Sequence, residues 1–318
     1  MIVTYDGMQS LDAIGPLEVF SSATKVAGHL HGVPQAYRVS LVSSTGASIR
    51  TESGLTIDTA PLPSARTAID TLVLAGGDGV HQARRDEALI TWIRRTAPRC
   101  RRVATVCTGT FLAAEAGLLD DRTVTTHWAR AERLAAEFPQ LTVDPDPIYV
   151  RDGEVWTSAG VTAGIDLALA LVDDDHGTEV AQTVARWLVM FLHRPGGQTQ
   201  FAAPVWVPRA ERSTVRAVQA LVEAAPGGDH RLPALAAAAA MSVRHFSRVF
   251  AHEVGETPGR YVERVRVEAA RHDLETTDDS LDTIARRCGF GTAETMRRSF
   301  HRRLSVAPDA YRQRFHVA

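Results

Sequence analysis

The 318 residues, with a formal net charge of −2 at pH 7, predict two domains of roughly 150 residues each. Three cysteines without the spacing of metal ligands exclude a disulfide framework and a zinc site, so we expect no metal and no cofactor. No run of about 18 apolar residues would cross a membrane, and the first residues lack the basic flank of a secretory signal, so we expect a cytoplasmic protein without a membrane partner.

Residues 1–192 alternate short apolar runs with helical patterns. In chain order these are IVTY and DAIGPLEVFSSAT, then YRVSLVS, then TLVLAGG and DEALITWIRRTA, and then RVATV and GTFLAAEAGLL. A hairpin with its turn at Asp152-Gly153 follows, and after it come two helical patterns, AGIDLALALVDDD and TEVAQTVARWLVMFL. This order predicts a doubly wound, flavodoxin-like α/β domain with mostly parallel strands.

Candidate site residues lie where the strands of this domain end, which is where such folds bind ligands. Cys107 lies at a strand-to-helix turn, where a nucleophile elbow would expose the thiol and a helix N-terminus would lower its pKa. A buried structural cysteine is the alternative. Gly76 and Gly77 would either direct N–H groups at an anion or only form a tight strand exit. Asp12 and Glu18 would either orient or deprotonate a thiol, or only cap and solvate a first helical turn.

Several motifs in this domain resemble the class I glutamine amidotransferase-like domain of the ThiJ/PfpI superfamily. They are LDAIGPLEVF, LVLAGGDG, VCTGTFLAAEAGLL, TVTTHW and SAGVTAGIDLAL. More narrowly, they resemble the version of this domain that is fused to AraC-type regulators and shared with isocyanide hydratases. The resemblance covers about residues 1–192.

The chain departs from the catalytic members of this superfamily. Peptidase-like members place a histidine directly after the elbow cysteine, whereas Thr108 stands there, and SAGVTAGID offers no later histidine. His127 in TTHW is the nearest base in sequence, with a packed histidine as the alternative. Cys107, Thr108 and Asp12 resemble isocyanide hydratases rather than hydrolases, so Cys107 is a candidate nucleophile and no catalytic residue is firm. The predicted ligand pocket comprises Asp12, Glu18, Gly76, Gly77, Cys107, Thr108 and His127.

Charge and turn-forming residues separate a second domain from the first. Residues 193–211 contain glycines and prolines without a hydrophobic period, and we expect a linker there. Residues 1–211 carry 18 basic and 24 acidic side chains, a net charge of −6, and residues 212–318 carry 17 and 13, a net charge of +4. Only the basic last third is therefore suited to a polyanion.

Residues 212–318 show helical patterns only. A short alanine-rich helix, a turn with Ser242 as N-cap and a second helix repeat about fifty residues later, with a turn at Gly289 to Gly291. A helix over residues 260–275 joins the two, so the pattern predicts an all-α domain with two helix-turn-helix motifs. We expect buried side chains at Phe246, Val249, Phe250, Leu281, Ile284, Ala285, Cys288, Met296 and Phe300, and exposed ones at Arg244, His245, Ser247, Arg248, Glu294, Arg297 and Arg298.

This domain resembles the AraC/XylS DNA-binding domain over roughly residues 212–316. The resemblance rests on MSVRHFSRVFAHEVGETPGRYVERVRVEAAR, IARRCGFGTAETMRRSFHRRL and PDAYRQRF, and Ser305 stands where a glycine is usual. It implies that double-stranded promoter DNA is bound. We expect the more peripheral Arg302 and Arg303 to contact phosphates, so that their removal would weaken binding to all sequences alike. The implied base-reading residues are Arg244, Ser247, Arg248, Glu294, Arg297 and Arg298.

Together the two resemblances imply a sequence-specific transcriptional regulator of the GlxA-like branch of the AraC family. Its first domain would bind a small-molecule effector, form a homodimer, or do both, and an activator would also contact RNA polymerase. One alternative is a cysteine-dependent enzyme, isocyanide-hydratase-like or amidohydrolase-like, that carries a DNA-binding domain. Another is a first domain that only dimerises and binds no ligand.

Overall fold

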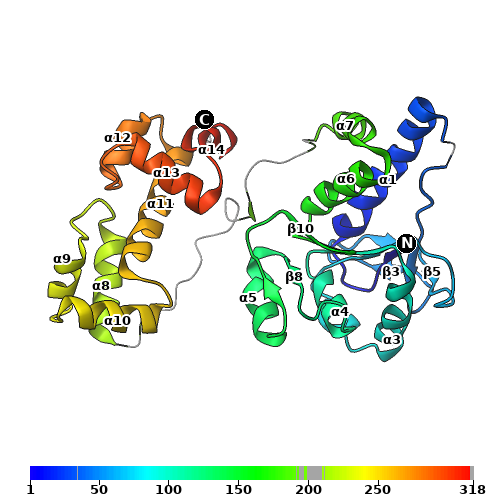
Figure 1. Cartoon of the computed structure of the whole chain (residues 1–318), viewed down its shortest axis with the longest axis horizontal. Coiled ribbons are helices and arrows are strands. Elements are labelled where there is room, and N and C mark those ends of the chain that lie inside the picture. The colour runs from blue at the N-terminus through cyan, green and yellow to red at the C-terminus, as the bar shows by residue number, and fades with distance from the viewer. Residues whose placement is uncertain (34, 191, 193–196, 199–209, 211, 316–318) are drawn as a thin grey trace. The chain divides into compact units, whose positions relative to one another are not determined.

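The structure is a computed structural model that describes residues 1–33, 35–190, 192, 197–198, 210 and 212–315 (Figure 1). The chain divides into two units, residues 1–199 and 200–318. Most of the predicted linker over residues 193–211 lies outside the described residues, so its boundaries stay a prediction. No helix among the described residues is long and apolar enough to cross a membrane.

A seven-stranded sheet forms the centre of the first unit. Its spatial order is β10-β11-β7-β6-β1-β2-β5, and all neighbours pair in parallel except β10 and β11. The order β2-β1-β6-β7-β11 is that of flavodoxin, so the predicted doubly wound fold is confirmed. The strands are β1 (Ile2–Val3), β2 (Leu41–Ser43), β5 (Ala60–Pro61), β6 (Thr71–Leu74), β7 (Arg102–Val106), β10 (Tyr149–Asp152) and β11 (Val155–Ser158).

Helices cover both faces of this sheet, with α1, α6 and α7 on one side and α3 and α4 on the other (Figure 1). All five residues of β7 are consequently buried, as in the central strands of parallel sheets. The helices are α1 (Ser10–His31), α2 (Val80–Ala83), α3 (Glu87–Thr96), η1 (Ala97–Arg99), α4 (Gly109–Glu115), α5 (Trp128–Glu137), α6 (Ala163–His176) and α7 (Thr178–Trp187). Two small sheets pair β3 (Ile49–Arg50) with β4 (Thr56–Ile57), and β8 (Thr123–Val124) with β9 (Thr142–Val143).

The end of α7 differs from the sequence pattern, whose apolar residues continue to Leu192. The helix ends at Trp187, because the Val189 N–H donates to the Arg186 carbonyl (3.1 Å) and the Met190 N–H donates to the Ala185 carbonyl (2.8 Å). These two bonds form a Schellman motif, in which Val189 takes the left-handed conformation with φ +56°. Apolar residues beyond a helix end can continue its period, so periodicity alone does not locate such an end.

Gln198 lies beyond α7 and is buried in the first unit, with 3% of its surface exposed. Its amide nitrogen donates to the Thr125 hydroxyl and to the carbonyls of Thr126 and Pro147, at 2.9 to 3.1 Å. Its amide oxygen accepts from the Trp128 N–H at 2.8 Å. Gln198 therefore attaches the end of the first unit to the segment between β8 and α5.

The second unit is helical and contains the two predicted helix-turn-helix motifs, α9 with α10 and α12 with α13 (Figure 1). Ser242 and Thr292 cap the second helix of each motif. Of the residues predicted to be buried, Leu281 is only half-buried and the other eight are buried. The helices are α8 (Ser213–Ala224), α9 (Leu232–Ala238), α10 (Val243–Val254), α11 (Pro258–Thr276), α12 (Leu281–Arg287), α13 (Ala293–Leu304) and α14 (Pro308–Phe315).

Ser305 ends α13 with φ +52°, the left-handed conformation in which glycine is favoured. We predict that Ser305→Gly stabilises the second unit by about 1 kcal/mol, because a side chain in this conformation is strained. Urea unfolding of the full chain, followed by circular dichroism, measures the change. Ser305→Ala keeps the strain and should give no gain, so equal stabilisation by both variants would contradict the explanation.

Candidate functional site

Cys107 lies between β7 and α4 in a strained turn, with φ +55°. Its side chain is buried, and its carbonyl accepts hydrogen bonds from the hydroxyls of Thr110 (3.1 Å) and Thr126 (2.8 Å). A Cβ atom at Gly160 would lie 2.7 Å from the Cys107 Sγ and 2.1 Å from its Cβ. The elbow is therefore present, but it is packed so closely that only glycine fits at position 160.

Asp12 is fully buried beside this elbow, in the first turn of α1. Its carboxylate accepts from the Gly76 N–H (3.1 Å), which follows β6, and from the Val161 N–H (2.8 Å), which follows β11. Val161 is a β-branched residue at φ +51°, a conformation that only a strong surrounding constraint maintains. Asp12 thus brings the ends of two strands and the start of α1 together.

Thr108 and Gly77 are linked by a pair of hydrogen bonds. The Thr108 hydroxyl accepts from the Gly77 N–H (2.8 Å) and donates to the Gly77 carbonyl (2.9 Å). The N–H groups of Gly76 and Gly77 therefore each have a hydrogen-bond partner inside the protein, Asp12 and Thr108 respectively. In the structure neither N–H group is directed at an anion site.

Burial dominates the titration of this site. It raises the pKa of Asp12 to about 7, although hydrogen bonds from Val161 and Gly76 lower it. Burial also raises the pKa of Cys107 well above its ordinary value, and the neighbouring Asp12 charge raises it further. Hydrogen bonds from Thr108 act in the opposite direction and are smaller, and no cation is among the groups that shift the thiol. At neutral pH the thiol is therefore protonated, which is the opposite of an activated nucleophile.

The two other members of the predicted pocket are not brought to the thiol. Glu18 is exposed, because six residues along α1 place it about 240° around the helix from Asp12. The Nδ1 atom of His127 accepts from the Ala129 N–H at 3.3 Å and so caps α5. Among the described contacts, His127 has none with Cys107. Gly160 and Val161 were not predicted as site residues from the sequence. A glycine shortly after a strand was the signal that could have identified Gly160.

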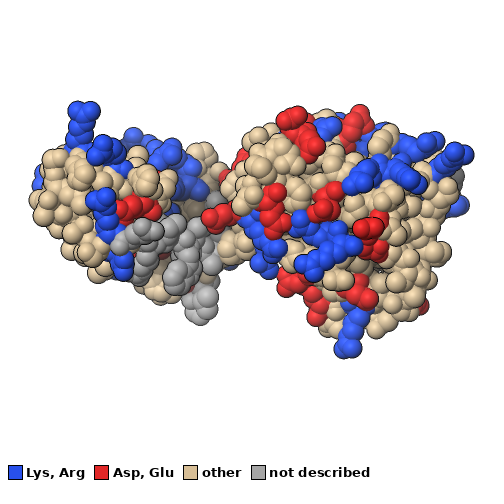
Figure 2. Space-filling view, turned by 90° about the horizontal axis from the view of Figure 1, so that it is seen from below, with Lys and Arg blue, Asp and Glu red and all other residues tan. Residues whose placement is uncertain are grey.

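In the second unit, the candidate base-reading side chains lie on α10 and α13. Arg244 and Arg248 are exposed, whereas Ser247 is half-buried and its hydroxyl donates to the Val243 carbonyl at 2.9 Å. On the face that Figure 2 shows, basic side chains are more frequent than acidic ones over this unit.

On α13, Glu294 lies beside two of the predicted arginines. It pairs with Arg297 at 3.1 Å and approaches Arg298 at 4.0 Å, so it holds them to one face of the helix. Arg302 and Arg303, predicted as phosphate contacts, also have partners within the protein. Arg302 pairs with Glu263 of α11, and Arg303 donates to the Arg260 carbonyl.

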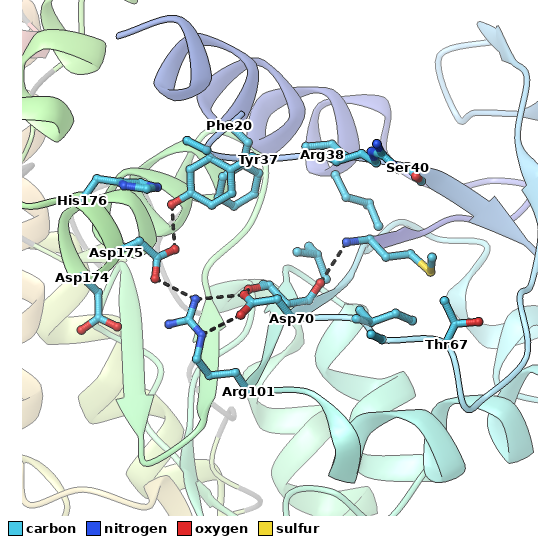
Figure 3. A pocket seen from close by; sticks show the side chains of 18 residues that line it. Phe20, Tyr37, Arg38, Ser40, Thr67, Asp70, Arg101, Asp174, Asp175 and His176 are labelled. Atoms are coloured by element: carbon cyan, nitrogen blue, oxygen red, sulfur yellow. Dashed lines mark hydrogen bonds and ion pairs between the residues drawn. The ribbon is translucent and has the colours of Figure 1, made fainter. Parts of the chain in front are cut away.

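A cavity of about 790 Å³ lies at the opposite end of the sheet from Cys107, where β1, β6 and β7 begin (Figure 3). On one wall, Asp175 accepts hydrogen bonds from the Tyr37 hydroxyl (2.7 Å) and from Arg101 (2.8 Å). Arg101 also pairs with Asp70 through both carboxylate oxygens, at 2.8 and 2.9 Å. The sequence did not predict this cavity, because the predicted pocket lies at the strand ends at which α/β folds usually bind ligands.

Comparison with known proteins identifies both units. Residues 1–174 match the DJ-1/PfpI family, and residues 235–314 match a helix-turn-helix domain. The HTH-type transcriptional regulator Rv1931c of Mycobacterium tuberculosis is 41% identical over 276 residues, which are 78% of this chain and 96% of the relative. The isonitrile hydratase of Pseudomonas putida is 36% identical over 178 residues, which are 56% of this chain and 72% of the relative.

A solved structure has the same fold as the first unit. The ThiJ/PfpI family protein of Pseudomonas syringae superposes with a TM-score of 0.53 and 24% identity, over 70% of this chain and 84% of that one. At this identity the likeness concerns the fold alone.

We predict that Asp12→Asn shifts the alkylation of Cys107 to lower pH by about one unit, because it removes the negative charge that raises the thiol pKa. Peptide-resolved mass spectrometry after iodoacetamide treatment between pH 7 and 11 measures this shift, and circular dichroism checks that the variant is folded. Glu18→Gln is the matched control on the same helix. An equal shift in the control would mean that Glu18, and not Asp12 alone, faces the thiol.

Proposed function

The chain belongs to the DJ-1/PfpI family and carries an AraC-type helix-turn-helix domain, and from this premise we propose that it is a sequence-specific DNA-binding transcriptional regulator. The observation that carries the proposal is the second unit. It holds two capped helix-turn-helix motifs, each with exposed arginines on its second helix. The 41% identity to a transcriptional regulator across both units supports it.

In this proposal α10 and α13 enter successive major grooves on one face of the duplex, about 34 Å apart. The connecting helix α11 has 19 residues and is about 28 Å long, which suits this separation once the flanking helices are added. Arginine reads guanine through a bidentate pair, and a glutamate accepts a hydrogen bond from cytosine. The proposed reading residues remain Arg244, Ser247, Arg248, Glu294, Arg297 and Arg298.

A regulator that binds promoter DNA acts in the cytoplasm, and an activator would also contact RNA polymerase there. One AraC-type domain contacts little DNA, so a homodimer formed by the first unit would increase the effective concentration of the second module at paired sites. A monomer in light scattering at micromolar concentration, with and without DNA, would contradict this part of the proposal.

The enzyme alternative rests on the 36% identity to an isonitrile hydratase. The geometry disfavours it, because burial and Asp12 keep the Cys107 thiol protonated, and no described histidine contacts it. We propose that the elbow is structural in this protein, so that Cys107→Ser leaves DNA binding intact. Turnover of an isocyanide that both Cys107→Ser and Asp12→Asn abolish would overturn this assignment.

For the small-molecule effector, the cavity at the start of the strands has more room than the closely packed elbow, and its 790 Å³ suits a small ligand. The carboxylates of its wall, Asp70, Asp174 and Asp175, are paired with arginines. Arg38 also lines the cavity, and it has no acidic partner among the described residues. The uncompensated charge is therefore positive, and we propose a small organic acid as the class of effector.

We predict that Arg248→Ala and Arg298→Ala each weaken binding to the specific site by about 1 to 3 kcal/mol and relax preference at one base position. The measurement uses duplexes that the wild-type chain selects from a random library, together with scrambled duplexes at the same salt concentration. Equal weakening on both kinds of duplex would make these arginines phosphate contacts.

We also predict that benzoate and hexanoate bind the cavity at millimolar concentrations, and that Arg38→Ala weakens this binding because it removes the unpaired charge. Titration calorimetry on the full chain measures the affinity, with Arg99→Ala as the control, since Arg99 is an exposed arginine of the same unit outside the cavity. Failure of both acids to bind, or equal binding by the Arg38 variant, would contradict the proposed site.

A further inference from the structure

The two helix-turn-helix motifs have separate hydrophobic cores. The first core includes Val265 of α11 and the second begins at Val267, so α11 contributes to both, but the two cores form separate clusters. Each second helix is therefore packed on the same continuous helix, α11, and this packing sets the basic arrangement of the two motifs. Because base reading by both second helices requires a fixed rotation between them, polar contacts that hold α13 against α11 and the first motif would add to this constraint.

A cluster of charged side chains crosses from one motif to the other along α11. We call it the inter-motif cluster, and its members are Glu256 from the turn after α10, Glu263 and Arg264 from α11, and Arg302 and Arg303 from α13.

Glu263 is the acidic centre of this cluster. One of its oxygens pairs with Arg302, and the other lies 3.5 Å from the Arg303 Nε. Arg303 also approaches Glu256 at 3.8 Å, and Glu256 is held by Arg264 at 2.8 Å. Glu256 directly follows the first motif and Arg264 lies on α11, so the cluster connects α13 to the first motif and to α11.

The acidic members of the cluster are more protected from solvent than those of an ordinary surface ion pair. The side chains of Glu263 and Glu256 are each 20% exposed and that of Arg303 is 23% exposed, whereas that of Arg302 is 63% exposed. Burial raises the pKa of Glu263 and the hydrogen bond from Arg302 lowers it, with a net lowering, so the carboxylate is charged at neutral pH. A shared, partly buried carboxylate contributes more than the exposed pairs that dominate protein surfaces.

A second contact lies elsewhere between the motifs and keeps them joined. Arg266 of α11 donates to the carbonyls of Pro226 (3.0 Å) and Gly228 (3.1 Å), in the loop between α8 and α9. Its guanidinium also packs against Gly289 of the second motif. Loss of the inter-motif cluster should therefore change the rotation of α13 without releasing the second motif.

We propose that Glu263 is a positioning residue for DNA reading: by holding Arg302 and Arg303 against α11, it fixes the rotation of α13 relative to α10. The proposal rests on the proposed DNA-binding function and gives these two arginines a role within the protein, while their contacts with phosphates stay a prediction. A purely electrostatic view makes the opposite prediction, because removing a carboxylate from a DNA-binding domain strengthens binding to every sequence.

The test compares Glu263→Gln with Asp282→Asn in the full chain. Asp282 is an exposed acid of the second motif for which the described contacts give no partner, so both variants add one unit of positive charge. We expect Asp282→Asn to strengthen binding to all duplexes slightly. We expect Glu263→Gln to weaken binding about three- to tenfold on the duplex selected by the wild-type chain, without weakening binding to scrambled DNA.

Two further measurements separate positioning from a general loss. Insertion of one base pair between the two halves of the selected duplex should cost the Glu263 variant less affinity than the wild type, because its motifs are no longer held at one rotation. Arg302→Gln added to Glu263→Gln should cause little further loss, since both act through one contact. If Glu263→Gln behaves as Asp282→Asn does on all duplexes, the proposal is wrong.

A readout without DNA distinguishes failure of the inference from failure of the proposed function. Spin labels on cysteines introduced at Ser247 and Arg298, in a chain carrying Cys100→Ser, report the distance between α10 and α13. Glu263→Gln should broaden that distance distribution and Asp282→Asn should not. A wild-type chain that selects no DNA sequence would overturn the proposed function, whereas an unchanged distribution would overturn the inference.

Discussion

The arrangement of the first unit depends on one buried carboxylate. Asp12 accepts hydrogen bonds from N–H groups that follow β6 and β11, and it does so with no exposure to solvent. Without it, the buried Gly76 N–H would have no partner, at a cost of about 1 to 3 kcal/mol, and the partly buried Val161 N–H would lose its acceptor. The hydrogen bond from the Val161 N–H is one of the constraints that hold this residue in its strained conformation. The glycine at position 76 follows from the same close approach, because a Cβ atom there would lie 2.7 Å from the Asp12 carboxylate.

This arrangement has a chemical consequence at the elbow. Burial raises the pKa of the Cys107 thiol most, and the charge of Asp12 raises it further, so the group that organises the loops adds to making Cys107 a poor nucleophile. A cation near Sγ would lower the thiol pKa, and none of the groups that shift the Cys107 pKa is a cation. The first unit therefore keeps the shape of a catalytic domain with electrostatics that suit a structural role.

The sequence predicted the fold well because both units follow strong periodic patterns. Alternating apolar runs defined the parallel sheet, and Ser242 correctly marked the start of α10. The sequence did not decide which of Asp12 and Glu18 lies beside the thiol, because both are carboxylates in one helical segment. Only the face of the helix on which each residue lies distinguishes them. The partners of Arg302 and Arg303 also remained hidden, because Glu263 lies 39 residues away in the chain and its contact exists only after the second motif folds. Likewise, the cavity gathers residues from strand starts that are distant in sequence.

The four hydrogen bonds of Gln198 determine where the first unit ends as a cooperative structure. A piece of the chain cut after Leu192 would expose the Trp128 N–H, the Thr125 hydroxyl and two carbonyls that the amide now covers. Because Thr126 also supports the Cys107 carbonyl, the damage would reach the elbow. An isolated first unit with native loops must therefore include this glutamine.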